Sequence, residues 1–185
     1  KFNLKNEPYC IFIGRIGFEK NIYFLIDAFK KITQTIPTLN LIIIGDGPEK
    51  KNLISIIEKN NLSSKIILTG YLDKKEVFTA LNIASLMLFP SKTETQGLTV
   101  VESLITGTPV IGLNEMGVKN ILENNQGGIL TKESIDDYAA AAISLLNNQT
   151  LYETYVKKAL LRSKDYDAEN LTNKLVNAYK SISNK

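Results

Sequence analysis

Residues 39–48 have the sequence Leu-Asn-Leu-Ile-Ile-Ile-Gly-Asp-Gly-Pro, a short apolar run that ends in two glycines and a proline. A run of this length and composition is typical of a strand that is buried on both faces of a sheet. Gly45-Asp46-Gly47 breaks the strand, and Pro48 fits the first turn of a helix that we expect to reach Asn60. The segment therefore predicts one strand–turn–helix unit of a parallel sheet.

The same unit recurs along the chain. Further apolar runs predict strands at residues 9–13, 65–69, 84–89, 109–112 and 128–130. Segments with apolar residues at helical spacing predict helices at residues 21–34, 73–82, 96–106, 118–123, 135–147, 150–164 and 168–183. This alternation predicts an α/β fold, a doubly wound, Rossmann-like parallel sheet of about six strands with helices on both faces. Asp73 and Glu76 fit a capping box at the start of the third helix.

Composition excludes several classes of protein. With 185 residues, 44% of them apolar and 22% charged, the chain fits one or at most two globular domains. Cys10 is the single cysteine and cannot form an internal disulfide, which favours a cytosolic protein. The absence of histidine excludes a Ser-His-Asp triad, a Cys-His pair and a histidine zinc site. The chain begins with Lys1 rather than Met, so we expect a piece of a longer protein.

The charge is distributed unevenly. Residues 1–92 carry 13 basic and 8 acidic side chains, whereas residues 93–185 carry 9 and 11. A mildly basic first half would suit a small anionic ligand, although ordinary surface lysines explain it equally well. The net charge of +3 is too small to predict a nucleic-acid partner. The least charged stretch, residues 77–91, is too short and too polar to span a membrane.

Ligands of doubly wound sheets bind beyond the carboxyl ends of the strands, so we expect a site after Ile13, Ile44, Thr69 and Phe89. Residues 14–20 are Gly-Arg-Ile-Gly-Phe-Glu-Lys, in which Arg15 and Lys20 could bind phosphate or simply be solvated. The G-x-x-G spacing does not match a nicotinamide fingerprint, and the chain contains no GxxxxGK[ST] P-loop.

The loop after the fourth predicted strand is the most informative. Residues 90–102 are Pro-Ser-Lys-Thr-Glu-Thr-Gln-Gly-Leu-Thr-Val-Val-Glu, and we expect a helix to begin near Thr95 or Gln96. The backbone N–H groups around Gly97, Leu98 and Thr99 would then lack intrahelical partners and form an anion site, reinforced by the helix dipole.

Two carboxylates flank this predicted anion site. Glu94 precedes the helix, and Glu102 shares a helix face with Leu98 and Ile105. A carboxylate on an apolar face needs a partner, which could be ribose hydroxyls or a nearby lysine. Glu94 could equally serve only to stabilise the helix N-terminus. The arrangement does not favour glycoside hydrolysis, which needs two carboxyl groups on either side of one bond.

Taken in order, these motifs resemble the nucleotide-sugar-binding half of retaining glycosyltransferases of family 4, also called glycosyl transferases group 1. The matching segments are Gly14-Arg15, Glu19-Lys20, Gly45-Asp46-Gly47-Pro48, Gly70-Tyr71, the E-x₇-E pair Glu94/Glu102 around Gly97-Leu98, and Gly107-Thr108-Pro109-Val110-Ile111. The resemblance covers nearly the whole chain. It implies a GT-B fold of two facing Rossmann-like domains, in which residues 1–185 form the single C-terminal donor-binding domain. The partner would be the missing N-terminal acceptor-binding domain, which the last helix would reach.

The resemblance also assigns roles to residues. Arg15, Lys20 and Glu94 would form the catalytic set, in which the two cations bind the donor diphosphate and Glu94 contacts the transferred sugar. The donor-binding set would comprise Gly14, Tyr71, Leu72, Gly97, Leu98, Thr99 and Glu102. In this set the backbone at residues 97–99 would cap the diphosphate, Glu102 would hold the ribose, and residues 71–72 would meet the base. The expected donor is a UDP-sugar such as UDP-glucose, and no metal or other cofactor is expected.

One departure bears on the acceptor. Residues 94–97 are Glu-Thr-Gln-Gly, where many members have Glu-Gly-Phe-Gly. The Thr-Gln form is similar to that of some glycolipid-forming members, including diacylglycerol glucosyltransferases. The resemblance therefore implies transfer of a hexose to a lipid or saccharide acceptor, in glycolipid or cell-surface polysaccharide synthesis. It leaves open a peripheral membrane contact through the full-length protein. A GT-B nucleotide-sugar epimerase and a non-catalytic nucleotide-sugar-binding module remain as alternatives.

Overall fold

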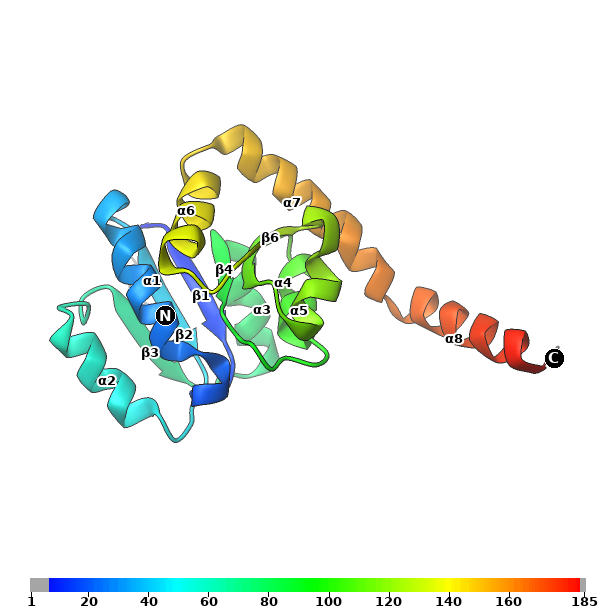
Figure 1. The fold of residues 1–185 in the computed structure, drawn as a ribbon, viewed down its shortest axis with the longest axis horizontal. Coiled ribbons are helices and arrows are strands. Elements are labelled where there is room, and N and C mark those ends of the chain that lie inside the picture. Colours follow the sequence, from blue (N-terminus) through cyan, green and yellow to red (C-terminus); the bar gives the residue numbers. More distant parts are fainter. Residues whose placement is uncertain (1–6, 184–185) are drawn as a thin grey trace.

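The computed structural model describes residues 7–183 and contains one six-stranded sheet in which all strands are parallel (Figure 1). The strands are β1 (Tyr9–Ile13), β2 (Asn40–Ile44), β3 (Ile66–Gly70), β4 (Leu86–Phe89), β5 (Val110–Leu113) and β6 (Gly128–Thr131). Their order in the sheet is β3-β2-β1-β4-β5-β6. The direction of winding therefore reverses between β1 and β4, the place where ligands enter doubly wound sheets.

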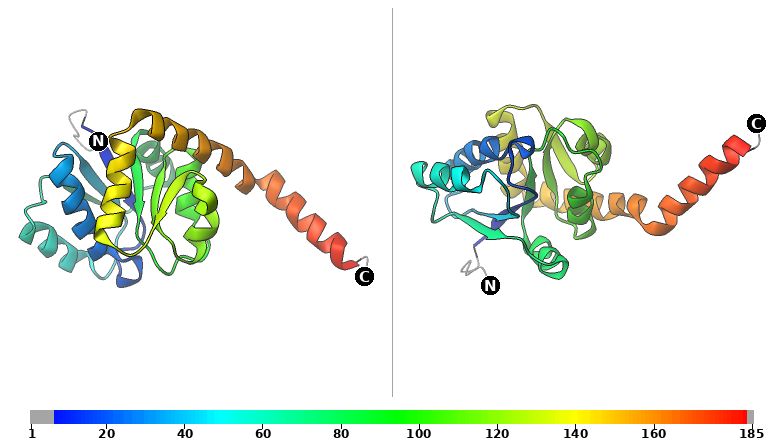
Figure 2. Two further views of the ribbon diagram at one scale, coloured as in Figure 1. Left: turned by 45° about the horizontal axis from the view of Figure 1, so that its top comes forward. Right: turned by 90° about the horizontal axis from the view of Figure 1, so that it is seen from below.

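Helices cover both faces of the sheet, which confirms the predicted fold class. The helices are α1 (Ile22–Thr35), α2 (Lys50–Lys59), α3 (Lys74–Ile83), α4 (Leu98–Ile105), α5 (Met116–Leu122), α6 (Ile135–Leu146), α7 (Gln149–Ser163) and α8 (Ala168–Ser183). Helices α1, α2 and α6 pack on one face, and α3, α4 and α5 on the other. Helix α7 contacts both groups, and α8 extends away from the sheet (Figure 2). Within residues 7–183, no helix has the length and apolar character needed to cross a bilayer.

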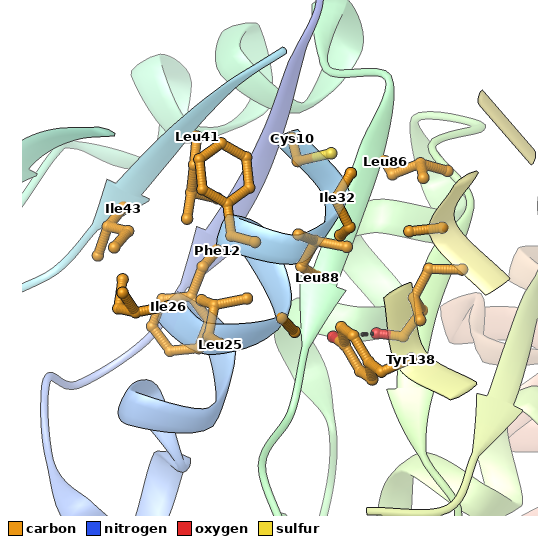
Figure 3. Packing of buried hydrophobic residues seen from close by; sticks show 14 of the residues in the cluster. Cys10, Phe12, Leu25, Ile26, Ile32, Leu41, Ile43, Leu86, Leu88 and Tyr138 are labelled. Atoms are coloured by element: carbon orange, nitrogen blue, oxygen red, sulfur yellow. Dashed lines mark hydrogen bonds between the residues drawn. The ribbon is translucent and has the colours of Figure 1, made fainter. Parts of the chain in front are cut away.

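Successive residues of each strand point to opposite faces and build two separate hydrophobic cores. In β1, Cys10 and Phe12 face α1 and α6, whereas Ile11 and Ile13 face α3 and α4. Figure 3 shows the first of these cores, in which the O–H of Tyr138 donates to the carbonyl of Ile111 at 2.9 Å. Burial on both sides explains why the strands are continuous apolar runs rather than alternating ones.

The loops after β1 and β2 lie directly against each other. The N–H of Gly14 donates to the carbonyl of Ile44 at 3.0 Å, and the N–H of Ile16 donates to that of Asp46 at 3.0 Å. A Cβ atom on Gly45 would lie 2.0 Å from the Gly14 carbonyl oxygen, and one on Gly47 would lie 2.3 Å from that of Ile16. The glycines of the Gly-Asp-Gly motif are therefore required for the two loops to approach.

Three predicted helix starts differ from the structure by two residues, and one of them is that of α5, which begins at Met116 rather than Val118. Pro48 lies in a turn and α2 begins at Lys50, and the N–H of Glu49 just before it donates to the carbonyl of Ile16. Helix α4 begins at Leu98 rather than near Gln96, because Gly97 is left-handed, with φ of +63°. The capping box at Asp73 and Glu76 is confirmed, with both of its hydrogen bonds present.

Gly45→Ala should destabilise the chain more than Gly70→Ala. Both glycines have positive φ, +139° and +71°, but a Cβ on Gly70 would meet no atom within 4 Å. Gly70→Ala therefore costs only the backbone strain, about 1–2 kcal/mol, whereas Gly45→Ala adds a backbone collision worth roughly 1–3 kcal/mol more. Thermal unfolding should place the Gly45 variant about 4–8 °C below the Gly70 variant. Equal melting temperatures would show that the two loops do not need this contact.

Candidate functional site

Lys20 and Glu94 meet at the carboxyl edge of the sheet, although 74 residues separate them in the chain. The Nζ of Lys20 donates to Oε2 of Glu94 at 2.7 Å, and the two side chains are only 19% and 18% exposed. Lys20 ends the 3₁₀ turn Phe18–Lys20 after β1, and its Nζ lies 5.9 Å from the centre of the Phe89 ring at the end of β4. The reversal of strand order between β1 and β4 thus brings together a cation and an anion that the sequence places in separate motifs.

Glu94 also caps helix α4. Its Oε1 accepts the N–H of Gly97 at 3.1 Å, so this N–H has a side-chain partner from outside the helix. Gly97 has φ of +63°, which favours glycine, and a Cβ there would come within 2.3 Å of Cδ1 of Ile121, so that side chain would have to move. The N–H of Gly117 holds the main chain of the same loop by donating to the carbonyl of Glu94 at 2.9 Å.

These contacts fix the charge of Glu94. Burial raises the pKa of its carboxyl group, but hydrogen bonds from Lys20 Nζ and from the N–H of Gly97 outweigh burial and leave the pKa below its usual value. Glu94 is therefore a carboxylate at neutral pH. The half-buried pair carries no net charge, because the ammonium of Lys20 balances it.

Hydrogen bonds also hold the residues on each side of Lys20, Glu19 and Asn21. The hydroxyl of Thr93 donates to the carbonyl of Glu19 at 3.2 Å. Glu133 accepts from Nζ of Lys92 at 2.9 Å and from Nδ2 of Asn21 at 3.0 Å. Sequence reasoning did not single out Lys92 and Asn21, although they follow the fourth and first strands, and it missed Glu133 because it considered only the first four strand ends. Glu133 follows β6, and the same rule applied there would have placed it at this edge.

Arg15 does not join the Lys20–Glu94 pair. Its side chain is 66% exposed, and its Nε lies 3.9 Å from Oε1 of Glu19 on the same loop. Gly14, the residue before it, is held by its hydrogen bond to Ile44. Arg15 therefore stands at the carboxyl edge as an exposed cation that is free to reorient, unlike the half-buried Lys20.

Glu102 has a different environment from the one its position in the helix predicts. Leu98 and Ile105, which share its face, are 63% and 49% exposed, so this apolar face is not packed into the core. Helix α4 packs against the sheet through Val100, Val101 and Leu104 instead. The carboxylate of Glu102 lies 3.5 Å from Nζ of Lys74 at the start of α3, the lysine partner that remained an alternative. One turn of helix separates it from the α4 N-terminus.

The remaining predicted binding residues line the same edge. Tyr71 follows β3 and is largely exposed, while Leu72 packs against the core under α3. Thr99 lies half-buried in the first turn of α4. Across residues 7–183, no group of three or more histidine, cysteine or acidic side chains is placed to hold a metal ion. A cavity of about 450 Å³, which includes Lys158 and Arg162 in its lining, lies beside α7 and away from this edge.

The chain belongs to the family described as glycosyl transferases group 1, whose model matches residues 1–162. The alpha-monoglucosyldiacylglycerol synthase of Acholeplasma laidlawii is 32% identical over 170 residues, which are 91% of this chain and 42% of that protein. The chain thus spans less than half the length of the curated relatives it matches.

Solved structures show the same fold. TarM of Staphylococcus aureus, crystallised as a mutant with fondaparinux, alpha-GlcNAc-glycerol and UDP, matches with a TM-score of 0.84 and 27% identity over 96% of this chain and 36% of that one. HepE of Anabaena, crystallised with UDP and glucose, matches with a TM-score of 0.85 over 96% of this chain and 49% of that one. Because the second match is only 20% identical, it shows a shared fold and nothing more.

Glu94→Gln should lower the free energy of unfolding at pH 7, and this loss of stability should become smaller as the pH falls. Because the folded-state pKa of Glu94 lies below its usual 4.5, the stability that the carboxylate supplies is complete above that pH. It is lost as the pH falls through the folded-state pKa. We expect a loss of about 1 kcal/mol at pH 7, measured by urea unfolding at pH 7 and below pH 4. An equal loss of stability at both pH values would contradict a stabilising ion pair. So would a loss that is unchanged when Lys20→Met is also present.

Proposed function

We propose that this member of the group 1 family is the donor-binding half of a retaining glycosyltransferase. Its donor would be a nucleoside-diphosphate sugar, specifically a UDP-hexose, bound at the carboxyl edge of the sheet. The observation that carries the proposal is the half-buried Lys20 beside the N-terminus of α4, at the point where the strand order reverses. A fixed cation and unpaired helix N–H groups are the partners that a diphosphate requires.

The relatives support the choice of donor and acceptor. TarM, 27% identical, was crystallised with UDP, which favours UDP as the nucleotide here. The name of the Acholeplasma enzyme specifies a glucosylated diacylglycerol as its product, which favours glucose as the sugar and a lipid as the acceptor. A saccharide acceptor remains the second choice, because the names of other relatives include a 2-deoxystreptamine N-acetyl-D-glucosaminyltransferase and a glycogen synthase. A cytosolic location remains a prediction.

The proposed chemistry uses the groups already placed at the edge. Lys20 and the first N–H groups of α4 would stabilise the negative charge that develops on the departing diphosphate, without a metal ion. Arg15 is exposed and would swing onto the same phosphates when the donor arrives. Glu102 would leave Lys74 to accept two ribose hydroxyls, and residues near Tyr71 and Leu72 would meet the uracil through the main chain. Glu94 would accept hydroxyls of the transferred sugar.

Binding of uridine and UDP to variants separates these roles. Lys20→Ala should weaken UDP binding by about 10–100-fold, since a charge-assisted phosphate contact contributes about 1.5–3 kcal/mol, and should leave uridine binding unchanged. Glu102→Gln should weaken the binding of uridine and of UDP by the same factor. With 2′-deoxy-UDP, which lacks one of the ribose hydroxyls, the affinities of the Glu102→Gln variant and the parent chain should differ less. Calorimetry in the presence of a chelator measures all of these without a metal ion.

Lys50→Ala is the matched control for Lys20→Ala. Lys50 pairs with Asp46 at 2.5 Å beyond the neighbouring strand, so its loss removes the same charge from an ion pair at the same edge. UDP binding should survive this change. If Lys20→Ala weakens uridine as much as UDP, if Lys50→Ala matches Lys20→Ala, or if the chelator abolishes binding, then the assignment of the diphosphate is wrong.

Residues 1–185 alone should transfer no sugar, whereas the same residues joined to a preceding acceptor domain should. Catalysis requires donor and acceptor to be held together, and the chain supplies groups for the donor side only. Radiolabelled transfer from UDP-glucose to diacylglycerol in mixed micelles, compared between the two proteins, measures this. Robust transfer by residues 1–185 would show that the chain is not half of an active site, and tight UDP-sugar binding without transfer by the longer protein would favour a non-catalytic module.

A further inference from the structure

The groups that should hold the donor diphosphate already have an anion between them. The carboxylate of Glu94 accepts Nζ of Lys20 at 2.7 Å through one oxygen and the N–H of Gly97 at 3.1 Å through the other. The carboxylate thus spans the cation and the helix N-terminus as a phosphate group would. The pair is half-buried, which makes its interaction stronger and less screened by salt than that of a surface pair.

A phosphate and the Glu94 carboxylate compete for Lys20. Two anions beside one ammonium repel each other, and burial increases the repulsion. We therefore expect the carboxylate to leave when a diphosphate binds. The main chain of Glu94 can remain in place meanwhile, because the N–H of Gly117 holds its carbonyl at 2.9 Å. Rotation of the side chain is enough to vacate the position.

We propose that Glu94 is an internal substitute for the donor phosphate, displaced by the diphosphate and then used to select nucleotides that carry a sugar. This inference rests on the proposed function, because it takes Lys20 as the diphosphate ligand. UDP alone displaces the carboxylate and offers it no new partner. A UDP-sugar displaces it and supplies hydroxyl donors in exchange, so the sugar compensates for the broken ion pair.

The same exchange favours release of the product. Once the sugar has been transferred, UDP remains at Lys20 while the carboxylate has lost its hydroxyl donors. Return of Glu94 to Lys20 and Gly97 then competes directly with the bound diphosphate. Glu94 would thus discriminate between the donor and the spent nucleotide at a single ammonium group.

The test is calorimetric titration of the chain with UDP and with UDP-glucose. Glu94→Gln removes the competing charge but keeps an oxygen that can accept the N–H of Gly97, so UDP should bind about tenfold more tightly than to the parent chain. The ratio of UDP-glucose affinity to UDP affinity should fall in the variant. Glu94→Ala should also tighten UDP binding, which covers the case in which the glutamine variant does not fold.

Asp46→Asn is the matched control. It removes one carboxylate from the ion pair with Lys50 at the same edge but leaves the Lys20–Glu94 pair intact, and UDP affinity should change less than twofold. A similar gain in Asp46→Asn would reduce the effect to net charge and overturn the inference. Unchanged or weaker UDP binding in both Glu94 variants, with Lys20→Ala still impaired, would overturn the inference and leave the proposed function standing. No UDP binding by any of these proteins would overturn both.

Discussion

Burial of the central strands on both faces leaves charged side chains no place in the body of the sheet. β1, β2, β4 and β5 are buried throughout, and the helices that cover them contribute mainly apolar side chains to the two cores. Charged residues therefore lie beyond the strand ends. Because the strands are parallel, the residues that follow them all lie at the carboxyl edge of the sheet. The Gly-Asp-Gly loop then fixes the loop after β1 against β2, so that Lys20 is carried on a braced segment rather than a loose one.

The fold could be predicted from the sequence because its signals are local. Apolar runs locate the strands, amphipathic spacing locates the helices, and the Asp73–Glu76 capping box depends on residues three positions apart. The helix starts at Pro48 and Gln96 could not be found in this way. The turn at Pro48 is held by a hydrogen bond from Glu49 to Ile16 in another loop, and Gly97 before α4 is left-handed. Neither feature changes the spacing of the apolar residues.

The site was predictable in its members but not in its pairings. Lys20, Glu94 and Gly97 were singled out separately, yet which carboxylate meets which lysine depends on tertiary structure across 74 residues. Glu102 shows the same limit. A helix presents several faces, and the sequence alone does not show that α4 packs through Val100 and Leu104 while Leu98 and Ile105 stay exposed. The strand-end rule would have placed Glu133 at this edge, but its pairing with Lys92 depends on where β6 ends relative to β4.

The proposed function requires that Lys20 and the N-terminus of α4 bind the diphosphate of a nucleotide-sugar. A crystal structure of this chain grown with UDP and a chelator tests it most directly. The claim predicts a phosphate oxygen within hydrogen-bonding distance of Nζ of Lys20 and of the first N–H groups of α4, with the carboxylate of Glu94 turned away. UDP bound elsewhere on the molecule, with the 2.7 Å contact between Lys20 and Glu94 intact, would contradict it.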